Sequence, residues 1–94
     1  MNNSIKILFF GLFKDIMGQK EFAFEIGNRL DFKNFLDLFN SKYERFNQIK
    51  RFIEDKDEKQ PVFIVLNGVT LKKPFEYQIQ TGDEVAFLPP VGGG

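Results

Sequence analysis

The chain has 94 residues, with no histidine and no cysteine, and its thirteen basic and thirteen acidic side chains cancel. This length allows one domain with one modest core, and a balanced charge without a basic block argues against a nucleic-acid partner. The missing residue types remove the usual metal ligands, the thiolate nucleophile, disulfides and the general base best suited to neutral pH, so we expect no metal and no cofactor bound by this chain.

The first apolar stretch, residues 5–10, predicts a central strand. Its apolar side chains fall on both faces, Ile5, Ile7 and Phe9 on one and Leu8 and Phe10 on the other. A strand of this kind is usually covered on both sides. Lys6 interrupts the stretch and no small-residue cleavage site follows, which argues against a secretory signal. No apolar run reaches the length of a membrane span, so we expect a cytoplasmic protein without a membrane partner.

The middle of the chain predicts a strand between helices. Residues 11–18 are bracketed by glycines and predict a short helix, and residues 20–26 alternate as a half-buried strand. Asp31 is the expected N-cap of the main helix. The apolar side chains of that helix follow α-helical spacing: Phe32, Phe35, Leu36, Phe39 and Tyr43. Residues 46–53 repeat this spacing over a shorter length and predict a second helix.

The polar run 54–61 allows two interpretations. Its acidic residues suggest a metal site, but no glycine provides the turn of a calcium loop and interleaved lysines would repel a cation. We therefore interpret it as a solvated loop. After it, residues 62–66 predict a strand and Asn67-Gly68 predicts a hairpin turn, because both residues tolerate positive φ. Residues 81–83 form an expected turn before a last strand, 85–88, which is apolar on both faces.

This order of elements predicts an α+β fold of the β-grasp, ubiquitin-like type, with a mixed sheet packed on one main helix. The first and last strands both have central character, so we expect them side by side and parallel. Thirteen phenylalanines provide much buried area from few side chains. We expect one domain over residues 1–94, with residues 89–94 as a protruding C-terminal tail.

The sheet face away from the main helix is a candidate partner surface. Depending on register, its apolar side chains are Leu8, Phe10, Phe63, Val65, Val85 and Phe87. Loops could cover any single one of them, but an exposed set usually marks a protein partner. We select Phe10 and Phe87 as members of this surface.

The tail "PPVGGG" has an unusual construction. Pro89 and Pro90 fix φ and favour an extended exit, and Val91 is the last side chain of any size. Gly92, Gly93 and Gly94 then have only the width of the backbone, and six residues reach at most about 20 Å. Such a tip suits a narrow channel in a partner, with the terminal carboxylate as the reactive group. Slack chain ends can look similar.

Two motifs resemble the small, sulfur-carrier subunit of molybdopterin synthase, within the ubiquitin-like sulfur carriers. "IKILFFGLFKDIMG" is similar to the opening strand and short helix of that family, and "GDEVAFLPPVGGG" is similar to its closing signature. The sequence departs from the family pattern at Lys14, where many members have arginine, and at Gly92, where alanine is frequent. The resemblance implies that Lys14, with Phe10 and Phe87, contacts the partner, but lysine cannot make the bidentate contact that arginine makes.

The resemblance implies a carrier that acts more as a co-substrate than as a catalyst. An E1-like adenylating enzyme would use ATP to activate Gly94, and a persulfide donor would supply sulfur for a thiocarboxylate. The tail would then enter the large subunit of molybdopterin synthase and give its sulfur to a pterin precursor. Two alternatives remain: a ubiquitin-like modifier joined to target lysines through Gly94, or a carrier of the thiamine-pathway type.

Overall fold

The computed structural model describes residues 3–54 and 62–90. Its helices are α1 (Gly11–Met17), α2 (Phe32–Lys42), α3 (Phe46–Glu54) and the short 3-10 helix η1 (Pro74–Glu76). Its strands are β1 (Ser4–Phe9), β2 (Glu21–Glu25), β3 (Arg29–Asp31), β4 (Phe63–Leu66), β5 (Val69–Thr70), β6 (Gln78–Gln80) and β7 (Glu84–Leu88). Both helices expected between residues 31 and 53 are present.

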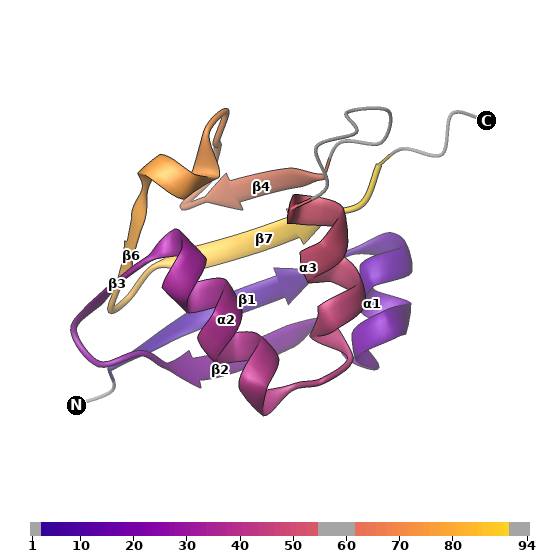
Figure 1. The fold of residues 1–94 in the computed structure, drawn as a ribbon, viewed down its shortest axis with the longest axis horizontal. Helices are drawn as coiled ribbons and strands as arrows, with labels where there is room; N and C mark the ends of the chain where they lie inside the picture. The colour runs from indigo at the N-terminus through magenta and orange to yellow at the C-terminus, as the bar shows by residue number, and fades with distance from the viewer. Residues whose placement is uncertain (1–2, 55–61, 91–94) are drawn as a thin grey trace.

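The main sheet confirms the β-grasp prediction. Its strand order is β2-β1-β7-β4-β5, and β1 pairs with β7 in parallel while the remaining neighbours are antiparallel. The first and last strands are therefore neighbours at the centre, as their apolar character predicted. In Figure 1, α2 and α3 lie across one face of this sheet, and α1 lies beside the ends of β1 and β7.

The core between the sheet and the helices consists largely of phenylalanine. The fully buried rings are Phe9, Phe13, Phe32, Phe35, Phe39, Phe46 and Phe87. Phe9 stacks on Phe87 across the central strand pair, with ring centroids 5.4 Å apart, and Phe39 of α2 meets Phe46 of α3 at 4.9 Å. Such pairs add about 0.5–1.5 kcal/mol each beyond the area they bury, so the rings hold both helices to the centre of the sheet.

Local polar contacts fix the start of α2 and join α2 to α3. Asp31 is the N-cap of α2, and its carboxylate accepts a hydrogen bond from the Asn34 backbone N–H at 2.7 Å. Lys50 of α3 lies 3.1 Å from the Asp37 carboxylate and 3.3 Å from that of Glu54. The hydrogen bond from Lys50 is the main cause that lowers the pKa of Asp37, against a smaller opposing effect of desolvation.

The hairpin after β4 also matches its sequence signal. Asn67 and Gly68 have φ values of 50° and 85°, which is the paired positive φ of the turn that Asn-Gly favours. In contrast, the small sheet of β3 and β6 was not predicted. Each of these strands has three residues with one apolar side chain, Leu30 or Ile79, and this is too short for an alternating pattern to stand out.

The structure corrects the predicted position of Phe87. Phe87 was expected on the exposed sheet face, but it is fully buried and stacks on Phe9 and Phe35. Val85 also faces the core. The reason is the register: Val85 pairs with Ile7 and Phe87 with Phe9, so both follow the buried side of β1.

The solvated loop was predicted over residues 54–61, but Glu54 is the last residue of α3. The predicted loop over residues 55–61 and the tail residues Val91, Gly92, Gly93 and Gly94 lie outside the described residues. Within residues 3–54 and 62–90, no helix has the length and apolar character required to cross a membrane. The same residues contain no cluster of three or more acidic side chains placed to bind a metal ion.

Candidate functional site

The root of the tail, formed by Pro89 and Pro90, lies where the end of β7 meets the start of α1. Pro89 and Pro90 follow β7 directly and are half-buried. The Phe10 N–H donates a hydrogen bond to the Phe87 carbonyl oxygen at 3.3 Å. A Cβ added at Gly11 would lie only 3.2 Å from Cγ of Pro89. The proline thus rests on a residue that has no side chain, and the first helix sets its position.

Gly11 also requires its conformational freedom for a second reason. Its φ is +54°, in the left-handed region, which costs an L-residue about 1–2 kcal/mol. Glycine therefore allows both the turn from β1 into α1 and the close approach of Pro89. The sequence pattern marked Gly11 only as the glycine before the predicted short helix and did not indicate this contact.

Phe10 and Lys14 lie beside this root, one helical turn apart. Phe10 is the N-cap residue of α1, and its carbonyl oxygen accepts hydrogen bonds from the backbone N–H groups of Phe13 and Lys14. Its ring is half-buried, with the Lys20 ammonium 5.0 Å from the ring centroid. Lys14 is exposed. Of the predicted partner surface, these two residues are accessible near the tail, and Phe87 is not.

The face of the main sheet opposite the helices carries an apolar strip next to the tail root. This outer sheet face consists of Leu8, Phe63, Val65, Ala86 and Leu88. Leu8 pairs with Ala86, and Ala86 also pairs with Val65 on its other side. Phe63 pairs with Leu88, the residue before Pro89, and Phe63 remains 43% exposed. None of the five belongs to the described core cluster on the helix side.

Three of these residues, Leu8, Phe63 and Val65, were among the candidates from the sequence. Ala86 and Leu88 were missed. Ala86 is a small residue between two larger apolar neighbours, so the sequence pattern did not mark it as a surface residue. Alternation along β7 indicates both residues once Val85 and Phe87 are known to face the core.

A polar network fixes β7 at its other end. The Asp83 carboxylate accepts hydrogen bonds from the Gln80 backbone N–H and from the Asn67 side-chain amide, both at 2.9 Å. The Asn67 side-chain oxygen accepts one from the Glu84 N–H at 2.9 Å. The Gly-Asp turn is thereby tied to the β4–β5 hairpin. This network sets the register of β7 and with it the direction of the tail root.

Together, these contacts fix β7 at both ends and place the apolar strip beside the root of the tail. The described residues of the site include an apolar strip, one exposed lysine and a fixed proline root, with no cluster of acid and base groups. The arrangement can dock a protein beside the root of the tail.

Comparison with known proteins places these features in context. A model of the ThiS family matches residues 7–94. A molybdopterin synthase sulfur carrier subunit from Dictyostelium discoideum is 26% identical over 94 residues, and the match covers all of both chains. The solution structure of the Haloferax volcanii HVO 2177 protein has a TM-score of 0.73 and 26% identity, covering 98% of this chain and 87% of that one. The small archaeal modifier protein 1 from Methanosarcina acetivorans has a TM-score of 0.69 at 23% identity, over 100% and 99% of the two chains, and supports the fold.

Proposed function

Since the chain belongs to the ThiS family, we propose that it is the sulfur-carrier subunit of a molybdopterin synthase. Its partners in this role are an E1-like adenylating enzyme, a persulfide donor and the large synthase subunit. The observation that carries the proposal is the fixed root of the tail, where Pro89 packs on Gly11 beside an apolar strip in which Phe63 is exposed. The name of the Dictyostelium relative supports the choice of pathway.

The proposed chemistry takes place at Gly94, and other proteins supply its catalysts. The terminal carboxylate attacks the α-phosphate of ATP and releases pyrophosphate, which leaves an acyl-adenylate. The terminal sulfur of the persulfide donor then displaces AMP and forms an acyl disulfide. A thiol attacks the donor's cysteine sulfur in that acyl disulfide, forms a disulfide with the donor and releases the thiocarboxylate. This chain needs no cysteine for that sequence, because its own backbone carboxyl carries the sulfur. ATP belongs to the activating enzyme, and the reactions would occur in the cytoplasm.

Each described element has a part in this proposal. The outer sheet face provides apolar area for docking the adenylating enzyme and then the large subunit. Phe10 and Lys14 extend that contact along α1. Pro89 and Pro90 give the tail its direction, and Val91, Gly92 and Gly93 pass through the partner's channel. A docked domain with a directed tail brings the carboxylate to the reactive phosphate with little further loss of freedom.

Intact-mass measurement tests the proposal directly. The full chain is incubated with ATP, an adenylating enzyme and a persulfide donor, and we expect a mass gain of one oxygen-to-sulfur exchange. A chain joined to lysine by an amide bond would instead support the modifier function. An unchanged mass, with no pyrophosphate released, would contradict both.

Variants of the tail test the narrow-channel part of the proposal. Gly93→Val should slow adenylation or sulfur transfer by about a hundredfold, because a branched side chain displaces the reacting carboxylate by about 1 Å. Gly92→Ala is the matched control and should be far milder. Deletion of Gly93 and Gly94 should abolish transfer and leave stability within about 0.5 kcal/mol of the parent. Equal, near-parental rates for the two substitutions would contradict the channel.

A further inference from the structure

The outer edge of β2 has backbone groups free for a new strand. Within the described residues, β2 is the edge strand and pairs only with β1. The Phe9 N–H donates to the Lys20 carbonyl oxygen at 2.8 Å, and the Ile26 N–H donates to the Asn3 carbonyl oxygen at 3.0 Å. Since hydrogen-bonding direction alternates along an antiparallel strand, the N–H and C=O groups of Ala23 and Glu25 point away from β1.

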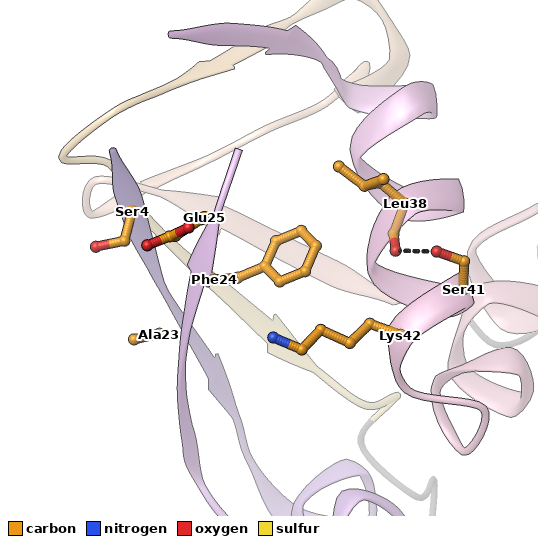
Figure 2. Close-up of a pocket in the computed structure, with 7 residues that line it drawn as sticks. All are labelled: Ser4, Ala23, Phe24, Glu25, Leu38, Ser41 and Lys42. Atoms are coloured by element: carbon orange, nitrogen blue, oxygen red, sulfur yellow. Dashed lines mark hydrogen bonds between the residues drawn. The ribbon is translucent and has the colours of Figure 1, made fainter. Parts of the chain in front are cut away.

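A groove runs along this edge between β2 and α2. Figure 2 shows the Phe24 ring and the Lys42 side chain filling the space between the strand and the helix, with Leu38 above them. Leu38 is 44% exposed although it is apolar. The Lys42 ammonium lies 5.8 Å from the centroid of the Phe24 ring. This side of the edge therefore offers an apolar surface followed by a positive charge.

The groove continues past Lys42 toward the beginning of β2. A second hollow shares Ser41 and Lys42 with the first, and its other charged lining residues are Glu44 and Arg45. Lys42 and Arg45 form none of the salt bridges between described side chains. Two basic side chains and one acidic side chain line the second hollow, so the surface along β2, from Phe24 toward Phe22, changes from apolar to net positive.

The opposite side of the same edge is acidic. Glu21 and Glu25 are exposed and flank Ala23, and Figure 2 shows Glu25 directed away from α2. In an antiparallel pair of two copies centred on Ala23, Glu21 would lie opposite Glu25 of the second copy on both sides. Like charges directly opposite one another destabilise a strand pair, so this edge disfavours a second copy of the chain.

We propose that the β2–α2 groove binds an extended segment of another protein as an added strand. The segment alternates: a bulky apolar side chain opposite Phe24 and an acidic one opposite Phe22 face α2, while basic side chains face Glu25 and Glu21. Its backbone pairs with Ala23 and Glu25. The site is separate from the tail, because β1 lies between β2 and β7, so such a partner can remain bound while the tail reacts.

A defined peptide tests this inference on the full chain. The probe is an end-blocked nonapeptide with the central sequence Lys-Ile-Thr-Glu-Lys, which satisfies the alternation when it runs antiparallel to β2. We expect amide shifts in nuclear magnetic resonance spectra at Ala23, Glu25 and Lys42 at peptide concentrations up to about 1 mM. Two control peptides are matched to it. One has the same residues in scrambled order, and the other is N-methylated at the threonine and at the first lysine. Both should bind at least about tenfold more weakly.

Substitutions in the protein test the same binding independently of the peptide controls. Ala23→Pro removes an N–H that points away from β1, and should weaken binding about tenfold, whereas Ala23→Ser retains it and should not. Lys42→Gln should weaken binding about threefold, and Lys72→Gln, at an exposed lysine outside the groove, should have no effect.

Three results would overturn the inference: equal affinity for the N-methylated peptide, shifts confined to the outer sheet face, or no binding at the highest concentration. If Ala23→Pro does not fold, as checked by circular dichroism, the N-methylated peptide still tests the same backbone bond. None of these measurements depends on sulfur chemistry, so the inference and the proposed function can fail independently.

Discussion

Gly11→Ala tests two roles of Gly11: its left-handed backbone conformation and its close contact with Pro89 at the root of the tail. Alanine at a φ of +54° should cost about 1 kcal/mol, because the strain outweighs the gain from a less flexible unfolded chain. The new Cβ would also lie 3.2 Å from Cγ of Pro89, whereas carbon atoms in good contact are about 3.5–4.0 Å apart. The proline must therefore move by a few tenths of an ångström.

Gly27→Ala provides the matched control. Gly27 has a φ of +77°, and a Cβ there would meet no heavy atom within 4 Å. It carries the cost of conformation without any contact to the tail. In urea denaturation both variants should lose about 1 kcal/mol, with a further loss of up to about 1 kcal/mol at Gly11 if Pro89 resists displacement.

Activity distinguishes the two variants more clearly than stability does. Because Pro89 begins the tail, a shift at this point changes the direction in which the terminal carboxylate is presented. We expect kcat/KM in pyrophosphate exchange to fall about tenfold for Gly11→Ala, since a displacement of about 1 Å can cost about a hundredfold. Gly27→Ala should keep the parental rate. Equal rates and equal stabilities for the two would refute the argument that Gly11 seats the tail.

The remaining predictions concern the core, the docking face and a surface ion pair. Phe87→Ala should destabilise the fold by about 3–5 kcal/mol in urea denaturation, because it empties a fully buried site; a loss below about 1 kcal/mol would contradict its place in the core. Leu8→Glu should leave stability within about 1 kcal/mol of the parent and weaken binding to the partner by about 2 kcal/mol in titration calorimetry, and unfolding instead would mean that Leu8 is a core residue. Lys50 lowers the pKa of Asp37, so the pair stabilises the fold above the ordinary Asp pKa of about 3.9, and this contribution is lost as the pH falls through the lower folded value. The parent should therefore lose stability more steeply than Asp37→Asn between about pH 4 and pH 2 in urea titrations, and parallel curves would contradict the assignment.

Long periodic segments and turn residues carried enough information to predict most of the fold. The spacing of phenylalanines from Phe32 onward predicted α2, and Asn67-Gly68 predicted the hairpin before β5. The apolar character of the first and last strands predicted their central pairing. The small β3–β6 sheet escaped because three-residue strands have no measurable period, and tertiary contacts decide whether they form.

Only part of the candidate site could be predicted from the sequence. Residues 85–88 are apolar at every position, so the sequence alone could not decide which side of β7 faces the core. Pairing with β1 decides it: Phe87 faces the helix side of the sheet, and Ala86 faces the opposite side, where it is only 7% exposed. The contact between Gly11 and Pro89 joins distant parts of the chain, and no local pattern reports such a contact.

The pairing of β1 with β7 also bears on how the protein matures in the cell. Lys6 pairs with Glu84, so the middle of the sheet forms only after synthesis has passed β7, and contacts between such distant residues form slowly. A translation product that stopped before Glu84 would leave Ile7 and Phe9 without their neighbours and could not complete its core. Interrupted synthesis should therefore yield unfolded chains, which are substrates for proteolysis. Every folded molecule that binds a partner would then contain β7, the strand that precedes the tail.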